Sequence, residues 1–143
     1  ATIVAIDYSM GMLQKARMRF LQHGVSNVHL FRADVANLPV RGDAVDIVLS
    51  MAGLHAVADK QRAIKEMRRV LRGQGTLLAD SYVRGARRRA DWIVRHILAR
   101  RGFFTPPFFH IDDIASELEG FTIRQQGSFE SCAWFEAVKN AAS

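Results

Sequence analysis

The chain has 143 residues, of which 49% are hydrophobic and 24% charged. This length favours a single domain with a core of its own over residues 1–143. One cysteine, Cys132, excludes an internal disulfide framework and a zinc site built from several cysteines. No apolar run approaches about 18 residues, so we expect neither a transmembrane segment nor a secretory leader, and we expect a cytoplasmic protein.

The basic excess of the chain is confined to one segment. Lys and Arg number 20 against 14 Asp and Glu, which gives a formal net charge of +6. Residues 84–101 contain seven arginines and one aspartate, so the rest of the chain is balanced, with 13 basic and 13 acidic residues. This segment is open to several interpretations: a solvated helix face, a surface for capturing substrate or a partner, an anionic membrane face, or a nucleic-acid-binding helix.

Short β-branched and apolar runs alternate with amphipathic stretches, which is typical of a parallel α/β sheet. The predicted strands cover residues 2–6, 28–31, 45–49, 76–79, 121–128 and 132–139. Only a few polar residues separate the last two strands, so we expect them to form an antiparallel hairpin.

Four helices are predicted between these strands. Three of them begin at the N-caps Ser9, Asp59 and Asp112, and they close at Gly24, near Leu71 and at Gly120. Gly73 and Gly75 are expected to stop the second of these before the strand at 76–79. The fourth covers the arginine-rich residues 84–101 and carries Ala86, Ala90, Ile93 and Ile97 on one face.

Four blocks in chain order are similar to motifs of the class I S-adenosylmethionine-dependent methyltransferases, nearest to the ubiquinone/menaquinone-biosynthesis branch. The blocks are residues 4–13 (VAIDYSMGML), 32–40 (RADVANLPV), 45–55 (VDIVLSMAGLH) and 66–75 (EMRRVLRGQG). Each block alone is weak, but four in order at this spacing are specific. The resemblance covers residues 1 to about 82 and implies a Rossmann-like, mostly parallel sheet with S-adenosylmethionine as cofactor.

The first block contains the expected ribose ligand. Asp7 follows a strand, where a carboxylate can accept hydrogen bonds from both hydroxyls of a ribose. The alternative is an aspartate that serves only the N-terminus of the next helix. The resemblance places Tyr8, Ser9 and Met10 at the cofactor as well.

The second and third blocks complete the implied cofactor set. The resemblance assigns Asp34 to the adenine amino group and the Val35 N–H to the ring, and the alternative for Asp34 is a loop cap. Residues 50–54 follow the third strand, in the crevice outside the strand ends, and Ser50 and Met51 are expected to bind the cofactor. The small residues Ala52 and Gly53 would let the backbone face the methionine part of the cofactor.

The sequence says less about the residues that bind the methyl acceptor. His55 could deprotonate a methyl acceptor, and the alternative for it is a packing role. The resemblance makes residues 83–110 an insertion or lid over a small, apolar or aromatic acceptor. Four phenylalanines at 103, 104, 108 and 109 could form that acceptor pocket or merely fasten the loop to the core. The five histidines show no metal-ligand spacing, so no metal site is expected.

One part of the expected fold does not occur in the sequence. Doubly wound nucleotide folds open with a strand, a glycine-rich turn and a helix, but the chain has no G-x-G-x-x-G or G-x-G-x-G motif. In the family this strand lies mid-sheet, so its absence would expose two apolar edges. We therefore expect a truncated domain whose sheet is completed by an upstream segment or a neighbouring chain, as in a dimer. Without the glycine-rich turn, tight cofactor binding is not expected.

Three other functions compete with methyl transfer. A non-catalytic methyltransferase-like scaffold would keep these motifs without the reaction. A nucleic-acid-binding module would use the arginine-rich helix, although no recognised nucleic-acid motif accompanies it. A nicotinamide-dependent dehydrogenase would also use an aspartate at a strand end, such as Asp7, but it does not explain the block at residues 32–40.

Overall fold

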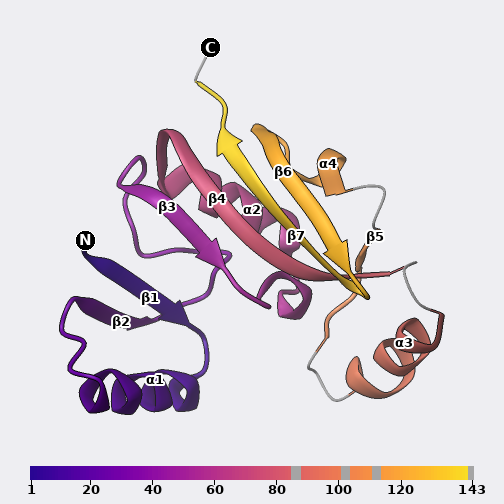
Figure 1. Cartoon of the computed structure of the whole chain (residues 1–143), viewed down its shortest axis with the longest axis horizontal. Coiled ribbons are helices and arrows are strands. Elements are labelled where there is room, and N and C mark those ends of the chain that lie inside the picture. Colours follow the sequence, from indigo (N-terminus) through magenta and orange to yellow (C-terminus); the bar gives the residue numbers. More distant parts are fainter. Residues whose placement is uncertain (85–87, 101–103, 111–113, 142–143) are drawn as a thin grey trace.

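The computed structural model describes residues 1–84, 88–100, 104–110 and 114–141, and its strands form two separate sheets (Figure 1). In the first sheet, β1 (Ile3–Asp7) pairs in parallel with β2 (Val28–Arg32). The second has the order β3-β4-β7-β6, with β5 paired to β4. Its strands are β3 (Val45–Ser50), β4 (Leu71–Arg84), β5 (Phe109–His110), β6 (Phe121–Phe129) and β7 (Cys132–Lys139). β3 and β4 are parallel and β6–β7 is an antiparallel hairpin, so the predicted mixed α/β architecture is confirmed.

The two longest helices begin at the N-caps that the sequence predicts. Ser9 Oγ accepts the Met12 N–H at 3.3 Å, at the start of α1 (Met10–Gln22). Asp59 Oδ1 accepts the Arg62 N–H at 2.9 Å, at the start of α2 (Lys60–Val70). Each bond satisfies an N–H that has no partner within the helix. After α1 the chain turns at Gly24, whose φ of 65° favours glycine.

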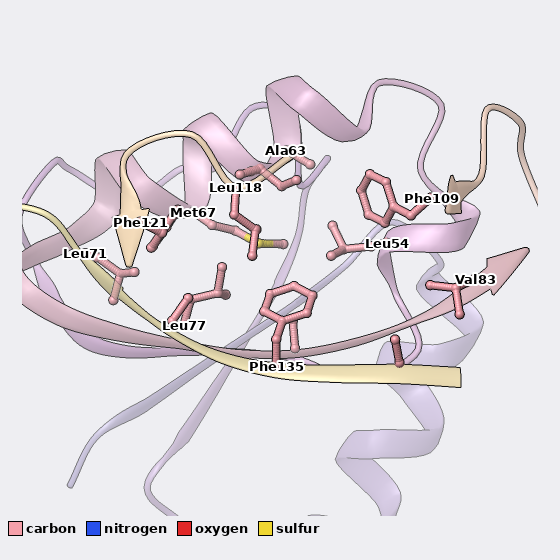
Figure 2. Close-up of a cluster of buried hydrophobic side chains, with 14 residues drawn as sticks. Leu54, Ala63, Met67, Leu71, Leu77, Val83, Phe109, Leu118, Phe121 and Phe135 are labelled. Carbon is pink, nitrogen blue, oxygen red and sulfur yellow. The ribbon is translucent and has the colours of Figure 1, made fainter. Parts of the chain in front are cut away.

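The core lies between α2 and the five-stranded sheet (Figure 2). Ala63, Ile64 and Met67 recur at helical spacing on the buried face of α2. They pack against strand residues such as Leu77 and Phe135, together with Leu54 and Leu118. Leu54 belongs to a 3₁₀ turn, η1 (Leu54–Ala56), and Leu118 follows the short helix α4 (Ile114–Glu117). Asp112, the predicted cap of the helix that ends near Gly120, lies outside the described residues.

The fourth strand is longer than the predicted 76–79. It begins at Leu71, directly after α2, and so includes both glycines that were expected to form the stop. A Cβ at Gly75 would lie 3.0 Å from the Arg72 carbonyl oxygen and 3.1 Å from that of Asp46. Glycine is therefore required by the close approach of β3 to an irregular stretch of β4, where the register shifts between Val45 and Ile47.

The arginine-rich segment does not form one α-helix over 84–101. Arg84 ends β4, α3 covers Arg88–Ile93, and a π-helical turn, η2, continues it over Val94–Leu98. Ala86, one of the four residues predicted to share an apolar face, lies outside the described residues. Ile93 and Ile97 are exposed rather than turned toward the core, because this helix projects from the end of β4 instead of covering the sheet (Figure 1).

β1 and β3 run in the same direction beside each other but do not pair (Figure 1). Both strands carry exposed apolar side chains, with Ile47 61% and Leu49 64% exposed on β3. Strands of a parallel sheet that is covered on both faces have nearly continuous apolar sequences. Ile3–Ile6 of β1 and Ile47–Leu49 of β3 are such runs. The interruption lies at the position where a central strand was expected to be missing.

Candidate active site

A cavity of about 850 Å³ runs along the gap between β1 and β3, from Val45 at the start of β3 to the turns at the carboxyl ends of the parallel strands. Three turns contribute to its wall: the one after β1, the one after β2, and the one after β3. Six of the eight predicted cofactor residues line it, namely Asp7, Tyr8, Asp34, Val35, Ser50 and Met51. Ser9 and Met10 do not line it, and neither does His55. The topology therefore brings three of the sequence blocks to one cavity, as expected for a ligand crevice outside strand ends.

Asp7 lines the cavity and also stabilises the turn after β1. Its Oδ1 accepts the Ser9 N–H at 2.7 Å, which is the helix-start role considered as the alternative for this residue. A carboxylate has two oxygens with several acceptor positions, so this bond orients the group without exhausting it. Tyr8 stands out with 71% of its surface exposed, and the Arg32 guanidinium lies 5.5 Å from the centre of its ring. Arg32 Nε also donates to the Tyr8 carbonyl at 3.1 Å.

Asp34 has the same double arrangement after β2. Its Oδ1 accepts the Ala36 N–H at 2.9 Å, and its carbonyl accepts the Asn37 N–H at 2.9 Å. These bonds form a tight turn of the kind aspartate favours. The loop-cap geometry is therefore present, and the turn that it stabilises places Asp34 and Val35 on the cavity wall.

The turn after β3 is held by a residue that sequence reasoning missed. Ala52 adopts a left-handed φ of 49°, and its N–H donates to Oδ1 of Asp80, near the middle of β4. Gly53 fits beside Ser50, because a Cβ at Gly53 would lie 3.1 Å from Ser50 Oγ. The signal was available: Asp80, like Asp7, is an acidic residue directly after a predicted strand.

His55 lies on η1 and turns toward the aromatic loop, residues 104–109. Its imidazole stacks on Phe104 with ring centres 4.4 Å apart and an interplanar angle of 21°. Nδ1 is buried and has no hydrogen-bond partner among the residues that the structure describes. Burial lowers the pKa of His55 below its ordinary value of 6.5, against the opposing effect of Asp80, and Lys60 lowers it further. The imidazole is therefore held neutral at pH 7.

A buried lysine fastens the aromatic loop to η1. Lys60, the first residue of α2, is only 4% exposed, and its Nζ donates to the Val57 carbonyl at 2.7 Å and to the Thr105 carbonyl at 2.5 Å. Thr105 in turn donates two hydrogen bonds to η1: its N–H donates to the His55 carbonyl at 2.9 Å, and its hydroxyl donates to the Ala56 carbonyl at 3.1 Å. Desolvation by burial lowers the pKa of Lys60.

Aromatic contacts extend this attachment to β4. Tyr82 meets Phe104 and Phe108 edge-on, with ring centres 5.4 Å apart in both pairs. The Tyr82 hydroxyl donates to Asp91 on α3 at 2.5 Å, and burial together with Asp91 raises the pKa of the phenol. Phe109 is buried in the core. Of the two interpretations of the phenylalanines, fastening to the core is the one that these contacts support, while Phe103 lies outside the described residues.

Two features are absent from the described residues. They contain no group of three or more His, Cys, Asp or Glu side chains that could hold a metal ion. None of the helices in that part of the chain is long and apolar enough to cross a membrane.

Comparison with known proteins identifies the family. Residues 1–79 match the model of a methyltransferase domain. The ubiquinone/menaquinone biosynthesis C-methyltransferase UbiE of Hahella chejuensis is 39% identical over 77 residues, which are 53% of this chain and 31% of that protein. The matched part spans about a third of the length of the curated relatives.

Solved structures agree on the fold. A crystal structure of a protein from Bacillus halodurans has a TM-score of 0.84 at 15% identity, over 99% of this chain and 84% of that one. A SAM-dependent methyltransferase from Aquifex aeolicus has a TM-score of 0.72 at 17% identity, over 96% and 69%. At these identities the likeness establishes the Rossmann-like fold. With more than half of its residues matched by the family model, the chain belongs to the methyltransferase domain family of the class I S-adenosylmethionine-dependent enzymes.

Proposed function

We propose that the chain binds S-adenosylmethionine at the carboxyl end of this cavity, where the turns after β1, β2 and β3 meet, and catalyses methyl transfer to a small, apolar or aromatic acceptor in the cytoplasm. The observation that carries this proposal is the gathering of Asp7, Asp34 and the Ser50–Met51 turn around one cavity of about 850 Å³. Small-molecule sites are concave and place a few convergent polar groups on a mostly apolar lining. The residues present therefore fit a nucleoside that carries an amino-acid arm.

Each wall of the cavity has a role in this proposal. The Asp7 carboxylate accepts from the ribose hydroxyls, while the Ser9 N–H keeps it oriented. The Asp34 carboxylate accepts from the adenine amino group, and the Val35 N–H donates to the ring. The left-handed turn at Ala52 presents backbone to the methionine arm. When bound, the cofactor would supply a methyl group on a sulfonium, from which a neutral thioether readily leaves, so the residues chiefly orient the reactants and exclude water.

The acceptor side comprises η1 and the inserted residues 83–110. Leu54 and Ala56 of η1 line the cavity, and the aromatic loop is fastened to the same turn through Lys60 and Thr105. An apolar acceptor would lie against the cavity side of η1, at Leu54 and Ala56. His55 is the candidate base, because a neutral imidazole can accept a proton and its lowered pKa keeps it neutral at pH 7.

Completion of the sheet is part of the proposal. The exposed edges of β1 and β3 are parallel, so an additional strand between them, from an upstream segment or from a second chain, would pair with both. Its following turn would reach the cavity and supply the backbone N–H groups that a glycine-rich loop provides. Hydrogen exchange tests this: amides on both edges exchange rapidly in the chain alone, and slow exchange there would contradict the idea.

Titration calorimetry with S-adenosylhomocysteine tests the cofactor site. We expect weak, saturable binding to the chain, and about tenfold weaker binding for Asp7→Asn and for Asp34→Asn, because each loses a charged hydrogen-bond acceptor. Asp46→Asn is the matched control, since that carboxylate is 77% exposed, pairs with Arg72 at 2.6 Å and lies outside the cavity wall. If all three variants bind alike, the assignment is wrong. A chain that binds no ligand at millimolar concentration would instead favour the non-catalytic scaffold.

A further inference from the structure

The helical segment after β4 has an outward face that the methyltransfer chemistry does not use. α3 and η2 project from the body at the end of β4 (Figure 1). Their base is fixed by the hydrogen bond from Tyr82 to Asp91 and by Val94, which is only 6% exposed. The segment is therefore anchored at one side and presents the other to its surroundings.

Large apolar side chains gather on the exposed side. Trp92 is 59% exposed, Ile93 45% and Ile97 40%, all within six residues. Exposed His96 lies beside Trp92, with ring centres 5.2 Å apart, and exposed Arg100 follows one turn later. Three large exposed hydrophobic residues so close together indicate a surface that another molecule covers.

The same segment carries the whole net charge of the protein. Seven arginines and one aspartate lie in residues 84–101, and the aspartate is Asp91, which is already engaged by Tyr82. A partner must therefore offer both anionic groups and an apolar interior. Nucleic acid would satisfy the arginines and could stack on an indole, but it offers nothing to two exposed isoleucines. A bilayer with anionic headgroups satisfies both requirements.

We propose that the helical residues 88–100, together with Arg84 at the end of β4, dock the protein on the surface of an anionic phospholipid bilayer. Trp92, Ile93 and Ile97 insert at the boundary between headgroups and acyl chains, while the exposed Arg84 and Arg100 meet the lipid phosphates. This mode is peripheral, consistent with the lack of a membrane-spanning helix among the described residues. The proposal is independent of cofactor binding, because vesicle binding is measured without any methyl donor.

Vesicle flotation of the full chain tests the apolar part. The chain should bind phosphatidylcholine vesicles that contain phosphatidylglycerol and not vesicles of phosphatidylcholine alone. The double variant Trp92→Ala/Ile97→Ser should bind at least about tenfold more weakly, since it loses buried apolar surface. Phe129→Ser is the matched control, because Phe129 is 76% exposed at the tip of the β6–β7 hairpin and should leave binding unchanged.

Charge variants test the electrostatic part of the proposal, and competition with RNA tests the nucleic-acid alternative. Arg84→Gln/Arg100→Gln should weaken binding about 25-fold, at roughly fivefold for each arginine near an anionic surface. The control pair Arg17→Gln/Arg41→Gln, also exposed, should bind like the parent chain. Equal binding to zwitterionic vesicles, or no effect of the Trp92 and Ile97 changes, overturns the proposal. So does binding to single-stranded RNA in preference to vesicles, which would make the segment a nucleic-acid surface.

Discussion

Replacement of Lys60 by methionine tests the attachment of the aromatic loop to η1. The Nζ of Lys60 donates to the carbonyls of Val57 and Thr105, and the side chain is buried. Methionine keeps most of the volume but cannot donate, so both carbonyls lose a partner, at about 1–3 kcal/mol each. Relief from burying an ammonium offsets part of this loss, which leaves a decrease in the free energy of unfolding of about 2 kcal/mol.

Two measurements check this magnitude. In thermal unfolding, about 2 kcal/mol corresponds to a fall in Tm of about 4–8 °C for a chain of this size. In hydrogen exchange, the Thr105 amide, bonded to the His55 carbonyl, should lose protection, while the Ala63 amide in α2 should keep it. Lys65→Met is the control, because Lys65 is exposed on the same helix. A Lys60→Met protein as stable as this control, with Thr105 still protected, would refute the attachment.

Three further predictions concern the site and its support. Because the pKa of His55 is lowered in the fold, the unfolded chain binds more protons than the folded chain does. The free energy of unfolding should therefore fall as pH drops below 6.5. In urea titrations, His55→Gln should lose this part of the pH dependence. Gly75→Ala should cost about 1–3 kcal/mol in the same assay, because its Cβ meets two backbone oxygens at 3.0 and 3.1 Å, whereas an unchanged midpoint would contradict the close approach. Asp80→Ala should weaken S-adenosylhomocysteine binding and speed exchange of the Ala52 amide, and a variant with parental affinity would remove Asp80 from the site.

Local signals of the sequence predicted most of the fold. The N-caps Ser9 and Asp59 and the β6–β7 hairpin are encoded within a few residues, so periodicity and capping suffice to find them. The start of β4 at Leu71 was not predicted, because two glycines close together, here Gly73 and Gly75, normally interrupt a helix or strand. Glycine is favoured at position 75 by the close backbone oxygens of Arg72 and of Asp46, and the second of these is distant in sequence.

The candidate site divides in the same way. Asp7 and Asp34 follow strands, so strand order alone predicts that they face one crevice. Lys60 was not predicted, because its role depends on a carbonyl 45 residues away, on a loop with no periodic signal. The orientation of His55 toward Phe104 depends on that same contact. Long-range hydrogen bonds of this kind leave no pattern in a single sequence.

The central claim is that one cavity, built from the turns after β1, β2 and β3, holds the cofactor. Titration of the ¹⁵N-labelled chain with S-adenosylhomocysteine, followed by amide chemical shifts, tests it most directly. The account predicts that the largest shifts occur at Tyr8, Val35 and Met51, one from each of those turns, and that they saturate together. Shifts confined to other parts of the chain, such as the β6–β7 hairpin, would contradict it.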